Sequence, residues 1–252
     1  MTLLSVVVPV RNEESRLSAT LSKLTAVLAA TRQSCEVVVV DNSSTDRSAA
    51  IAREHQSGPV PVRLLRCAQP GKGAAVRTGV LRTDSRYVGF CDADLATDLA
   101  ALGPTLKFLN AGVNVVVGSR AHPNSIVRAR HSQVRRSGAW AFRHVAKSLV
   151  PGVGDTQCGY KFFDRHTADM IFQPLRTPGW SFDVELLARA QRIGAMIVEL
   201  PVSWTDMPGS TFQPMRDGYR SFAALARIRA ILGAEKPATF VAPVMAPVAE
   251  VA

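Results

Sequence analysis

The feature of this sequence best suited to chemistry is a pair of carboxylates that directly follows an apolar run. Asp92 and Asp94 flank a single alanine and come after Tyr87–Cys91, whose residues are typical of a buried strand. Two carboxylates so placed can both reach one divalent cation, and Mg²⁺ or Mn²⁺ takes carboxylate and phosphate oxygens together. A D-x-D pattern is common by chance, so its weight comes from its place at a strand end.

A second candidate is the glycine-rich stretch Gly71-Lys72-Gly73, which opens a helical pattern. It does not match G-x-x-x-x-G-K-[ST], and Val76 stands where G-x-G-x-x-G/A needs a small residue. Kinases and dinucleotide-dependent oxidoreductases therefore lose support. Two interpretations stay open: a plain helix entry, or backbone amides and the Lys72 ammonium that face a phosphate.

The elements that must position these residues alternate along the first 120 residues. Continuous apolar runs predict five buried strands, at Leu4–Pro9, Glu36–Asp41, Val62–Arg66, Tyr87–Cys91 and Val113–Gly118. Helical patterns separate these strands. They lie at Glu13–Ala30 with Asn12 as N-cap, at Asp46–Gln56, from the glycine-rich stretch to about Arg82, and at Leu99–Leu109. Such alternation predicts an α/β fold with a doubly wound, mostly parallel sheet flanked by helices.

A parallel sheet would bring several polar residues to one edge, because ligands bind beyond the carboxyl ends of the strands. Arg11 follows the first strand, Asp41 the second, and Asp92 the fourth. We therefore expect residues 1–120 to be a nucleotide-binding half. Residues 121–232 predict a smaller α+β half, and residues 233–252, rich in Ala, Pro and Val, predict a flexible tail.

Charge is distributed unevenly along the chain. The 252 residues carry a formal net charge of +10, yet no Asp or Glu occurs from Leu99 to Gly154. The cations of this span are Lys107, Arg120, Arg128, Arg130, Arg135, Arg136, Arg143 and Lys147. A basic segment favours phosphates, nucleic acid or anionic lipid headgroups. Clustered carboxylates at strand ends would repel a nucleic acid backbone, so we expect no nucleic acid partner.

The order of these motifs resembles a known family. VVVPVRNEESRL, VVVVDNSSTD, GKGAAVRTG, the DAD after YVGFC, and VVVGSR resemble a family 2 glycosyltransferase of the GT-A fold. DTQCGYKFF (Asp155–Phe163), WSFDVELLARAQRIG (Trp180–Gly194) and ELPVSW are similar to polyprenyl- and dolichyl-phosphate hexosyltransferases, most of all the dolichyl-phosphate β-glucosyltransferase branch. The resemblance covers about residues 3–212, in matching order.

The resemblance implies roles for residues on the donor side. Pro9, Arg11 and Glu13 would frame the nucleotide, and Asp41 would contact its base or ribose. Asp92 and Asp94 would hold the sugar nucleotide and a Mg²⁺ or Mn²⁺ ion, and Lys72 would face the donor phosphates. UDP-glucose is the favoured donor and GDP-mannose the alternative. The family often has two aspartates after the second strand, and here Asn42 takes the second place.

Roles on the acceptor side follow from the same resemblance. Arg120 would meet a phosphate, and Arg135 or Arg136 would meet the phosphate of a polyprenyl or dolichyl acceptor. The sugar and acceptor pocket would be shaped by Asp155, Gln157, Trp180, Asp183 and Glu185. Such an acceptor is largely a dianion at pH 7 and needs no strong base, so one in-line displacement would invert the anomeric centre.

An enzyme that acts on a soluble acceptor is the main alternative. An alcohol acceptor would need a general base, for which Asp155 is the candidate. The cysteines form no C-x-x-C pair, which fits a reducing cytosol, and no uncharged apolar run reaches about 18 residues. We therefore expect a cytoplasmic protein that meets the cytosolic face of a membrane peripherally.

Two basic amphipathic segments could make that membrane contact. The first runs from Arg128 to Val150 and carries Val134, Trp140, Phe142, Val145 and Leu149 among its cations. In the second, from Met215 to Leu232, apolar residues recur at threes and fours, namely Tyr219, Phe222, Leu225, Ile228 and Ile231. Such helices can lie in an anionic interface, although amphipathic stripes more often pack on a core.

Overall fold

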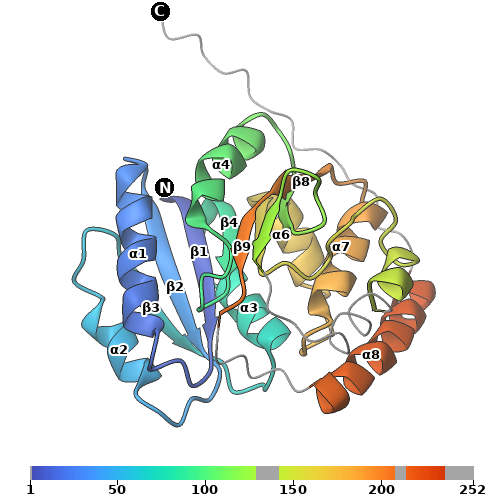
Figure 1. The fold of residues 1–252 in the computed structure, drawn as a ribbon, viewed down its shortest axis with the longest axis horizontal. Helices are drawn as coiled ribbons and strands as arrows, with labels where there is room; N and C mark the ends of the chain where they lie inside the picture. Colours follow the sequence, from blue (N-terminus) through green and yellow to red (C-terminus); the bar gives the residue numbers. More distant parts are fainter. Residues whose placement is uncertain (1, 129–141, 208–213, 236–252) are drawn as a thin grey trace, which may run out of the picture.

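The computed structural model describes residues 2–128, 142–207 and 214–235 of the chain (Figure 1). Its strands are β1 (Thr2–Val10), β2 (Cys35–Asp41), β3 (Val62–Arg66), β4 (Ser85–Cys91), β5 (Val115–Ser119), β6 (Ile126–Arg128), β7 (Tyr160–Asp164), β8 (Ile197–Pro201) and β9 (Ser203–Thr205). Its helices are α1 (Leu17–Ala30), α2 (Ser48–Glu54), α3 (Lys72–Val80), η1 (Leu99–Ala101), α4 (Leu102–Asn110), α6 (Arg165–Phe172), α7 (Phe182–Arg192) and α8 (Pro214–Ala234). A further helical turn covers residues 142–147.

Seven strands form the main sheet, in the order β3-β2-β1-β4-β7-β5-β8. The pairs β3–β2, β2–β1, β1–β4 and β5–β8 are parallel, and β7 runs antiparallel to both of its neighbours. The expected α/β fold with a doubly wound, mostly parallel sheet is confirmed. All five strands expected within residues 1–120 are present, each within two residues of the expected bounds.

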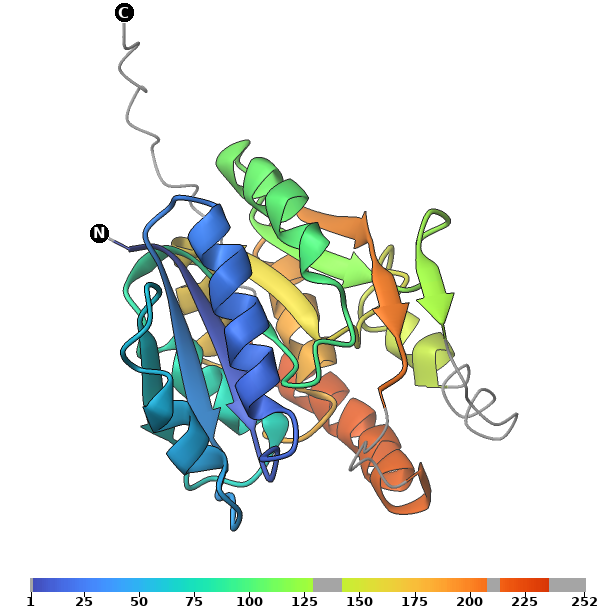
Figure 2. The same cartoon turned by 60° about the vertical axis from the view of Figure 1, so that its left-hand side comes forward.

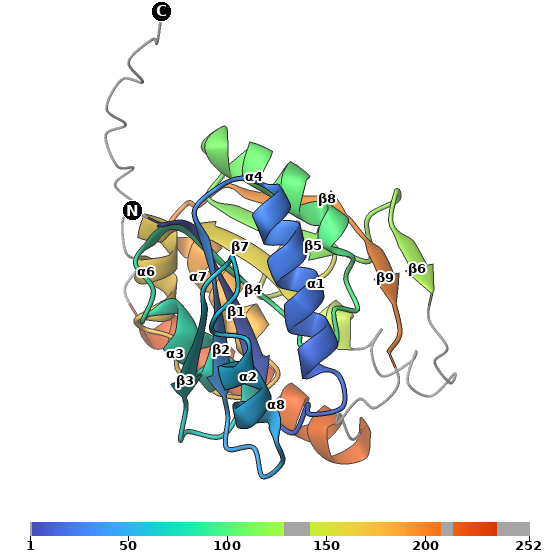
Figure 3. The ribbon, with the colours of Figure 1, turned by 90° about the vertical axis from the view of Figure 1, so that its left-hand side faces the viewer.

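Helices cover both faces of this sheet, which explains why its strands are continuously apolar. One apolar core joins alternate strand residues such as Val38 and Phe90 to α3, α6, α7 and α8. The other joins their neighbours, such as Val39 and Cys91, to α1, α2 and α4. Figure 3 shows the same layers, with α1 and α4 on one side of the strands and α3 and α6 on the other.

The loop after β1 differs from the prediction. Helix α1 begins at Leu17 rather than Glu13, and its N-cap position is Arg16. Asn12 is not an N-cap: it has φ 56°, a conformation that asparagine tolerates better than most residues. Its side-chain oxygen accepts a hydrogen bond from the Thr45 amide at 2.8 Å, and its own amide donates to Ser44 Oγ. The loops after β1 and β2 are thereby joined.

The second half of the chain completes the sheet begun by the first. Strands β7 and β8 both follow residue 120, yet β7 lies between β4 and β5. Because β7 is antiparallel, its beginning, not its end, lies at the edge where β4 and β5 end. Beside this sheet, β6 pairs in parallel with β9 (Figure 2). The main sheet therefore contains strands from both sides of residue 120. The division of the chain there into two halves stays a prediction about function.

Helix α8 packs on the core through part of the stripe that the sequence offered to a membrane. Leu225, Ile228 and Leu232 are buried, so this part of the prediction is corrected, whereas Phe222 is 38% exposed. The helix runs to Ala234, and the Glu235 carboxylate accepts hydrogen bonds from Arg189. Residues 236–252, most of the predicted tail, lie outside the described residues.

The packing of β4 against β7 gives a first test. A Cβ at Gly89 would lie 2.1 Å from Cδ1 of Phe162, whose side chain is buried, so Gly89→Ala must displace that ring. Overpacking of this kind typically costs about 1–3 kcal/mol. We expect Gly89→Ala to lower the free energy of unfolding by about that amount in urea denaturation. Gly103→Ala, where a Cβ meets nothing within 4 Å, is the matched control and should be neutral or slightly stabilising. Equal stability of the two variants would contradict this packing.

Candidate functional site

One edge of the sheet collects the residues that the sequence singled out. Strands β1, β2, β4 and β5 end there, and β7 begins there. The segments that meet are therefore those starting at Arg11, Asn42, Asp92, Arg120 and Asp155. The expectation that a crevice outside the strand ends would gather distant polar residues follows directly from this topology.

Asp92 and Asp94 lie at the centre of this edge, at the end of β4. The Asp92 amide donates to the Gly159 carbonyl at 3.1 Å, which ties β4 to the segment before β7. The Asp92 carboxylate forms an ion pair with Lys72, with Nζ and Oδ1 2.5 Å apart. Asp94 Oδ1 accepts the Ala96 amide, and Leu95 has φ 46°, so the chain turns sharply between strand and helix. The D-x-D and the glycine-rich loop are thus one site.

The carboxylates at this edge are close enough to perturb one another. Burial, and then the Asp92 charge, raise the pKa of Asp94 above its ordinary value. Burial also raises the pKa of Glu13, with Asp94 and Asp92 adding to the effect and Arg16 opposing it. Burial alone would lower the pKa of Lys72, but Asp92, Asp183 and Asp94 outweigh it and raise that pKa. The edge therefore holds excess negative charge that a cation would stabilise.

This negative charge suits a divalent cation whose coordination is completed by water and by the phosphates of a bound substrate. Among the described residues, no three His, Cys, Asp or Glu side chains converge as a ready-made metal cage. Mg²⁺ commonly binds through one or two carboxylates and takes its other ligands from water and substrate phosphates. Asp92 and Asp94 match that donor set.

A buried asparagine fixes the glycine-rich loop that carries Lys72. The Asn42 side-chain amide donates to the carbonyls of Cys67 and Gln69, at 3.1 and 2.7 Å. Its oxygen accepts the Gly71 amide at 2.8 Å. An aspartate could not donate these two hydrogen bonds. Asn42, which is only 4% exposed, is therefore needed here to hold the loop. Its neighbour Asp41 is also buried and accepts the Ser44 amide through Oδ1.

Gly71 itself is required by close packing. It has φ 124°, and a Cβ there would lie 2.2 Å from the Pro178 carbonyl oxygen. The Ala74 amide, in the first turn of α3, donates to that same carbonyl. The next residues bring Trp180, which is 39% exposed and whose ring lies 5.5 Å from Lys72 Nζ. The structure therefore places Trp180 beside Lys72, and the role of Trp180 in a sugar and acceptor pocket stays a prediction.

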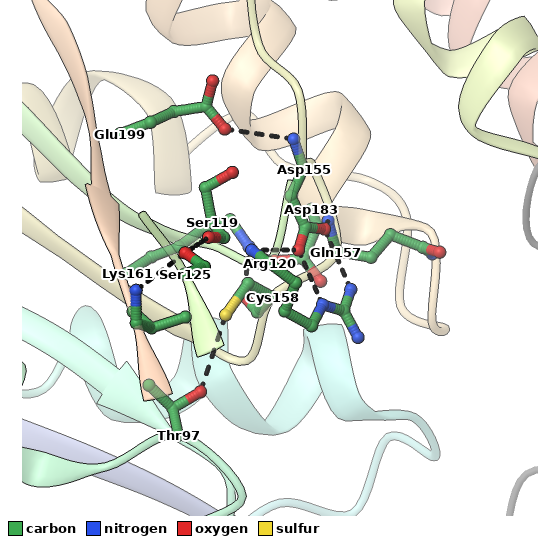
Figure 4. Close-up of polar contacts among 11 residues, drawn as sticks. Thr97, Ser119, Arg120, Ser125, Asp155, Gln157, Cys158, Lys161, Asp183 and Glu199 are labelled. Carbon is green, nitrogen blue, oxygen red and sulfur yellow. Dashed lines mark hydrogen bonds and ion pairs between the residues drawn. The ribbon is translucent and has the colours of Figure 1, made fainter. Parts of the chain in front are cut away.

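Arg120 and Asp155 form a two-pronged ion pair at the same edge (Figure 4). Arg120 Nε and Nη2 lie 2.6 and 2.9 Å from the two carboxylate oxygens, and the Arg120 amide donates as well. Glu199 holds the chain from the other side by accepting the amides of Gly154 and Asp155. Burial would raise the pKa of Asp155, but Arg120 lowers it to about 2. A carboxylate held in this way is a poor proton acceptor, which argues against Asp155 as a general base.

A second buried ion pair lies beneath the D-x-D. Lys161 Nζ is 2.7 Å from Asp183 Oδ1, and both side chains are almost fully buried. The same ammonium donates to the Cys158 carbonyl and lies 5.5 Å from the centre of the Phe90 ring. Burial raises the pKa of Asp183, and the nearby ammonium groups of Lys161 and Lys72 offset part of the rise. Lys161 was not among the predicted site residues, and its only signal was the apolar strand around a lone lysine.

The other predicted residues divide by position. Gln157 is half-buried beside Asp155, Pro9 is half-buried in β1, and Arg11 is exposed just after it. Glu185 does not reach the site: it is fully buried and accepts the amides of Arg176 and Thr177 and the Arg189 guanidinium. Its role is to hold the loop that leads to Trp180. Arg135 and Arg136 lie outside the described residues.

Comparison with known proteins shows which family this chain resembles. The model of the family "Glycosyl transferase family 2" matches residues 5–172. Dolichyl-phosphate beta-glucosyltransferase of Dictyostelium discoideum is 33% identical over 240 residues, which are 90% of this chain and 73% of that protein. The Drosophila melanogaster enzyme of the same name is 37% identical over 226 residues, with 84% and 69% covered. The sequence resemblance to this branch is thereby confirmed.

Solved structures support the fold. Glucosyl-3-phosphoglycerate synthase from Mycobacterium tuberculosis, in complex with Mg²⁺ and uridine diphosphate, superposes with a TM-score of 0.67. The match covers 90% of this chain and 79% of that one, at 19% identity. A second structure of that enzyme, with Mn²⁺, UDP-glucose and phosphoglyceric acid, gives a TM-score of 0.65 over 96% and 88% of the two chains, again at 19% identity.

The Arg120–Asp155 pair generates a pH-dependent prediction. The folded pKa of Asp155 is about 2 against an ordinary value of 3.8, so its contribution to stability is full above pH 4 and is lost as the pH falls to 2. That difference corresponds to about 2 kcal/mol. We expect Asp155→Asn to unfold at lower urea concentration at pH 7, with the gap to the wild type closing toward pH 2. The exposed Asp84, changed to Asn, is the control. A gap that is constant with pH would contradict the assignment.

Proposed function

The chain belongs to glycosyl transferase family 2, and we propose that it transfers a hexose, glucose first of all, from a nucleotide sugar to a polyprenyl phosphate. The enzyme class, a glycosyltransferase, follows from the family model and from relatives at 32–37% identity. The names of those relatives support glucose as the sugar and dolichyl phosphate, a polyprenyl phosphate, as the acceptor. UDP-glucose is the proposed donor, and GDP-mannose is the alternative to test.

The donor side of the proposal rests on the end of β4. Asp92 and Asp94 would hold Mg²⁺ or Mn²⁺, which when bound would neutralise charge on the leaving diphosphate. Lys72, 2.5 Å from Asp92, lies where its ammonium could reach the same phosphates. Glu13, Arg11 and Asp41 border the nucleotide position at the ends of β1 and β2. Trp180 would close the sugar side above Lys72.

The observation that carries the acceptor class is the pairing of the acceptor-side carboxylates. Asp155 is held by Arg120 and Asp183 by Lys161, so neither is placed to take a proton from an alcohol. A phosphate monoester is largely a dianion at pH 7 and attacks without such a base. The protein's tasks are then alignment and charge neutralisation, and a single displacement inverts the anomeric carbon. The soluble-alcohol alternative loses its candidate base.

Contact with a membrane surface is part of the same proposal, because a polyprenyl acceptor resides in one. No helix among the described residues is long and apolar enough to cross a bilayer. Exposed apolar side chains at Ile126, Val127, Val145 and Phe222 accompany the exposed cations Arg128, Arg143 and Lys147. Such a mixture supports peripheral binding to anionic lipid, at the cytosolic face. Arg135 and Arg136 stay the predicted contacts of the acceptor phosphate.

Metal dependence gives the first functional test. Asp94→Asn removes one proposed ligand with little change of shape, and losing one such electrostatic contact typically costs about 10²–10³-fold in rate. We expect that loss in a labelled-sugar transfer assay, and loss of wild-type activity in excess EDTA with recovery on adding Mn²⁺ or Mg²⁺. Asp84→Asn, an exposed aspartate, is the control. Full activity in EDTA would contradict metal dependence.

A donor and acceptor screen tests the function itself. The chain is mixed with labelled UDP-glucose or GDP-mannose and either a polyprenyl phosphate or a soluble phosphate ester, and the product is partitioned into organic solvent. We expect solvent-soluble label with UDP-glucose and the polyprenyl phosphate, with the opposite anomeric configuration from the donor. Transfer only to the soluble ester would overturn the lipid acceptor, and transfer only from GDP-mannose would overturn the donor.

A further inference from the structure

We propose that Lys72 competes with the divalent cation for Asp92, so that metal and nucleotide diphosphate bind cooperatively and the metal alone binds weakly. The inference rests on the donor site of the proposed function and adds an order of occupancy to it. The Lys72 ammonium and the metal ion would both need Asp92 Oδ1. A bound diphosphate offers the ammonium another partner, so the metal ion can take that oxygen.

The first step is that Asp92 is fixed. Its backbone amide bonds Gly159, and a Cβ at Gly159 would lie 1.9 Å from Asp92 Oδ2, so that oxygen packs directly against the glycine backbone. The other oxygen, Oδ1, is the one that contacts Lys72 Nζ at 2.5 Å. Asp92 therefore cannot easily turn to serve an ammonium and a metal ion with separate oxygens.

The second step is that Lys72 is held in place rather than loosely attached. It is the first residue of α3, and the preceding Gly71 is anchored by the Asn42 side chain. The Pro178 carbonyl accepts the Ala74 amide and closes the same turn from the other side. The Trp180 ring covers the ammonium at 5.5 Å, and only 12% of the Lys72 side chain is exposed. The ion pair is therefore preorganised, and a metal ion must displace it.

The third step is the balance of charge. Without a ligand, one ammonium partly neutralises the Asp92–Asp94 pair, and a divalent cation arriving at Asp92 Oδ1 would meet that ammonium at close range. The two cations would repel each other at this short distance, and the repulsion is stronger than in bulk water because the Lys72 side chain is only 12% exposed. A diphosphate changes the balance, since its oxygens can accept the Lys72 ammonium while also coordinating the metal. Each ligand then raises the affinity of the other by the same factor.

The experiment is a Mn²⁺ titration, followed by electron paramagnetic resonance of free Mn²⁺, with and without UDP or GDP. Lys72→Met removes the competitor, so we expect Mn²⁺ alone to bind at least about tenfold more tightly than to the wild type, a change of about 1.4 kcal/mol. The same variant should lose most of the enhancement of Mn²⁺ affinity that the nucleotide gives the wild type. Lys72→Arg keeps the cation and should keep weak binding of Mn²⁺ alone.

Two further arms keep the outcomes distinct. Lys107→Met removes an exposed lysine on α4 and should leave both affinities unchanged. Lys72→Gln replaces Lys72→Met if the latter does not give a cooperative thermal unfolding transition. Mn²⁺ affinity that is unchanged or reduced in Lys72→Met and Lys72→Gln would overturn the inference while leaving the donor site intact. A wild type that binds neither nucleotide, with or without Mn²⁺, would overturn the donor site and the inference together.

Discussion

The constraint on which the site depends is the crowding of carboxylates at one edge of a parallel sheet. Asp92 and Asp155 converge there because strands that are distant in the sequence end or begin at the same edge, and Asp183 approaches from the first turn of α7. Each is held by its own cation, namely Lys72, Arg120 and Lys161. Removing one partner of a buried pair leaves an unpaired charge, which destabilises the fold. Each carboxylate therefore depends on its cation, and each cation on its carboxylate. Asp94 belongs to the same cluster: burial and the Asp92 charge raise its pKa, and it is one of the two proposed metal ligands.

Strand β7 is what makes this crowding possible. It is the one strand of the main sheet that runs against its neighbours, so the segment from Asp155 to Gly159 enters the edge from outside and packs against Asp92. A parallel β7 would place these residues at the opposite edge. Gly159 is needed at the contact because a side chain would collide with the Asp92 carboxylate. The antiparallel strand thus joins the proposed donor side of the site to the proposed acceptor side.

The sequence predicted the strands and the sheet class because long apolar runs are local signals. The residues that follow these runs predicted which side chains meet at the sheet edge, and the roles of those side chains stay predictions. The sequence could not predict that β7 inserts between β4 and β5, since no local pattern encodes which strands become the neighbours of a given strand. For the same reason Lys161 was missed and Glu185 was placed in the pocket: whether a charged residue meets a ligand or a buried partner depends on tertiary packing. The shift of the start of α1 from Glu13 to Leu17 has a similar origin, because Asn12 and its neighbours bond the loop after β2 instead of capping a helix.

A further set of contacts connects the end of α8 to the glycine-rich loop. Glu235 bonds Arg189, which bonds Glu185, and Glu185 in turn accepts the amides of Arg176 and Thr177. The next residue, Pro178, accepts the Ala74 amide beside Lys72. Each of these charged groups and backbone amides has a defined partner. Together they hold the loop that carries Trp180 against α7 and the residue that follows α8. The residue that follows α8, the helix that carries the exposed Phe222, is therefore connected through these contacts to the loop beside Lys72.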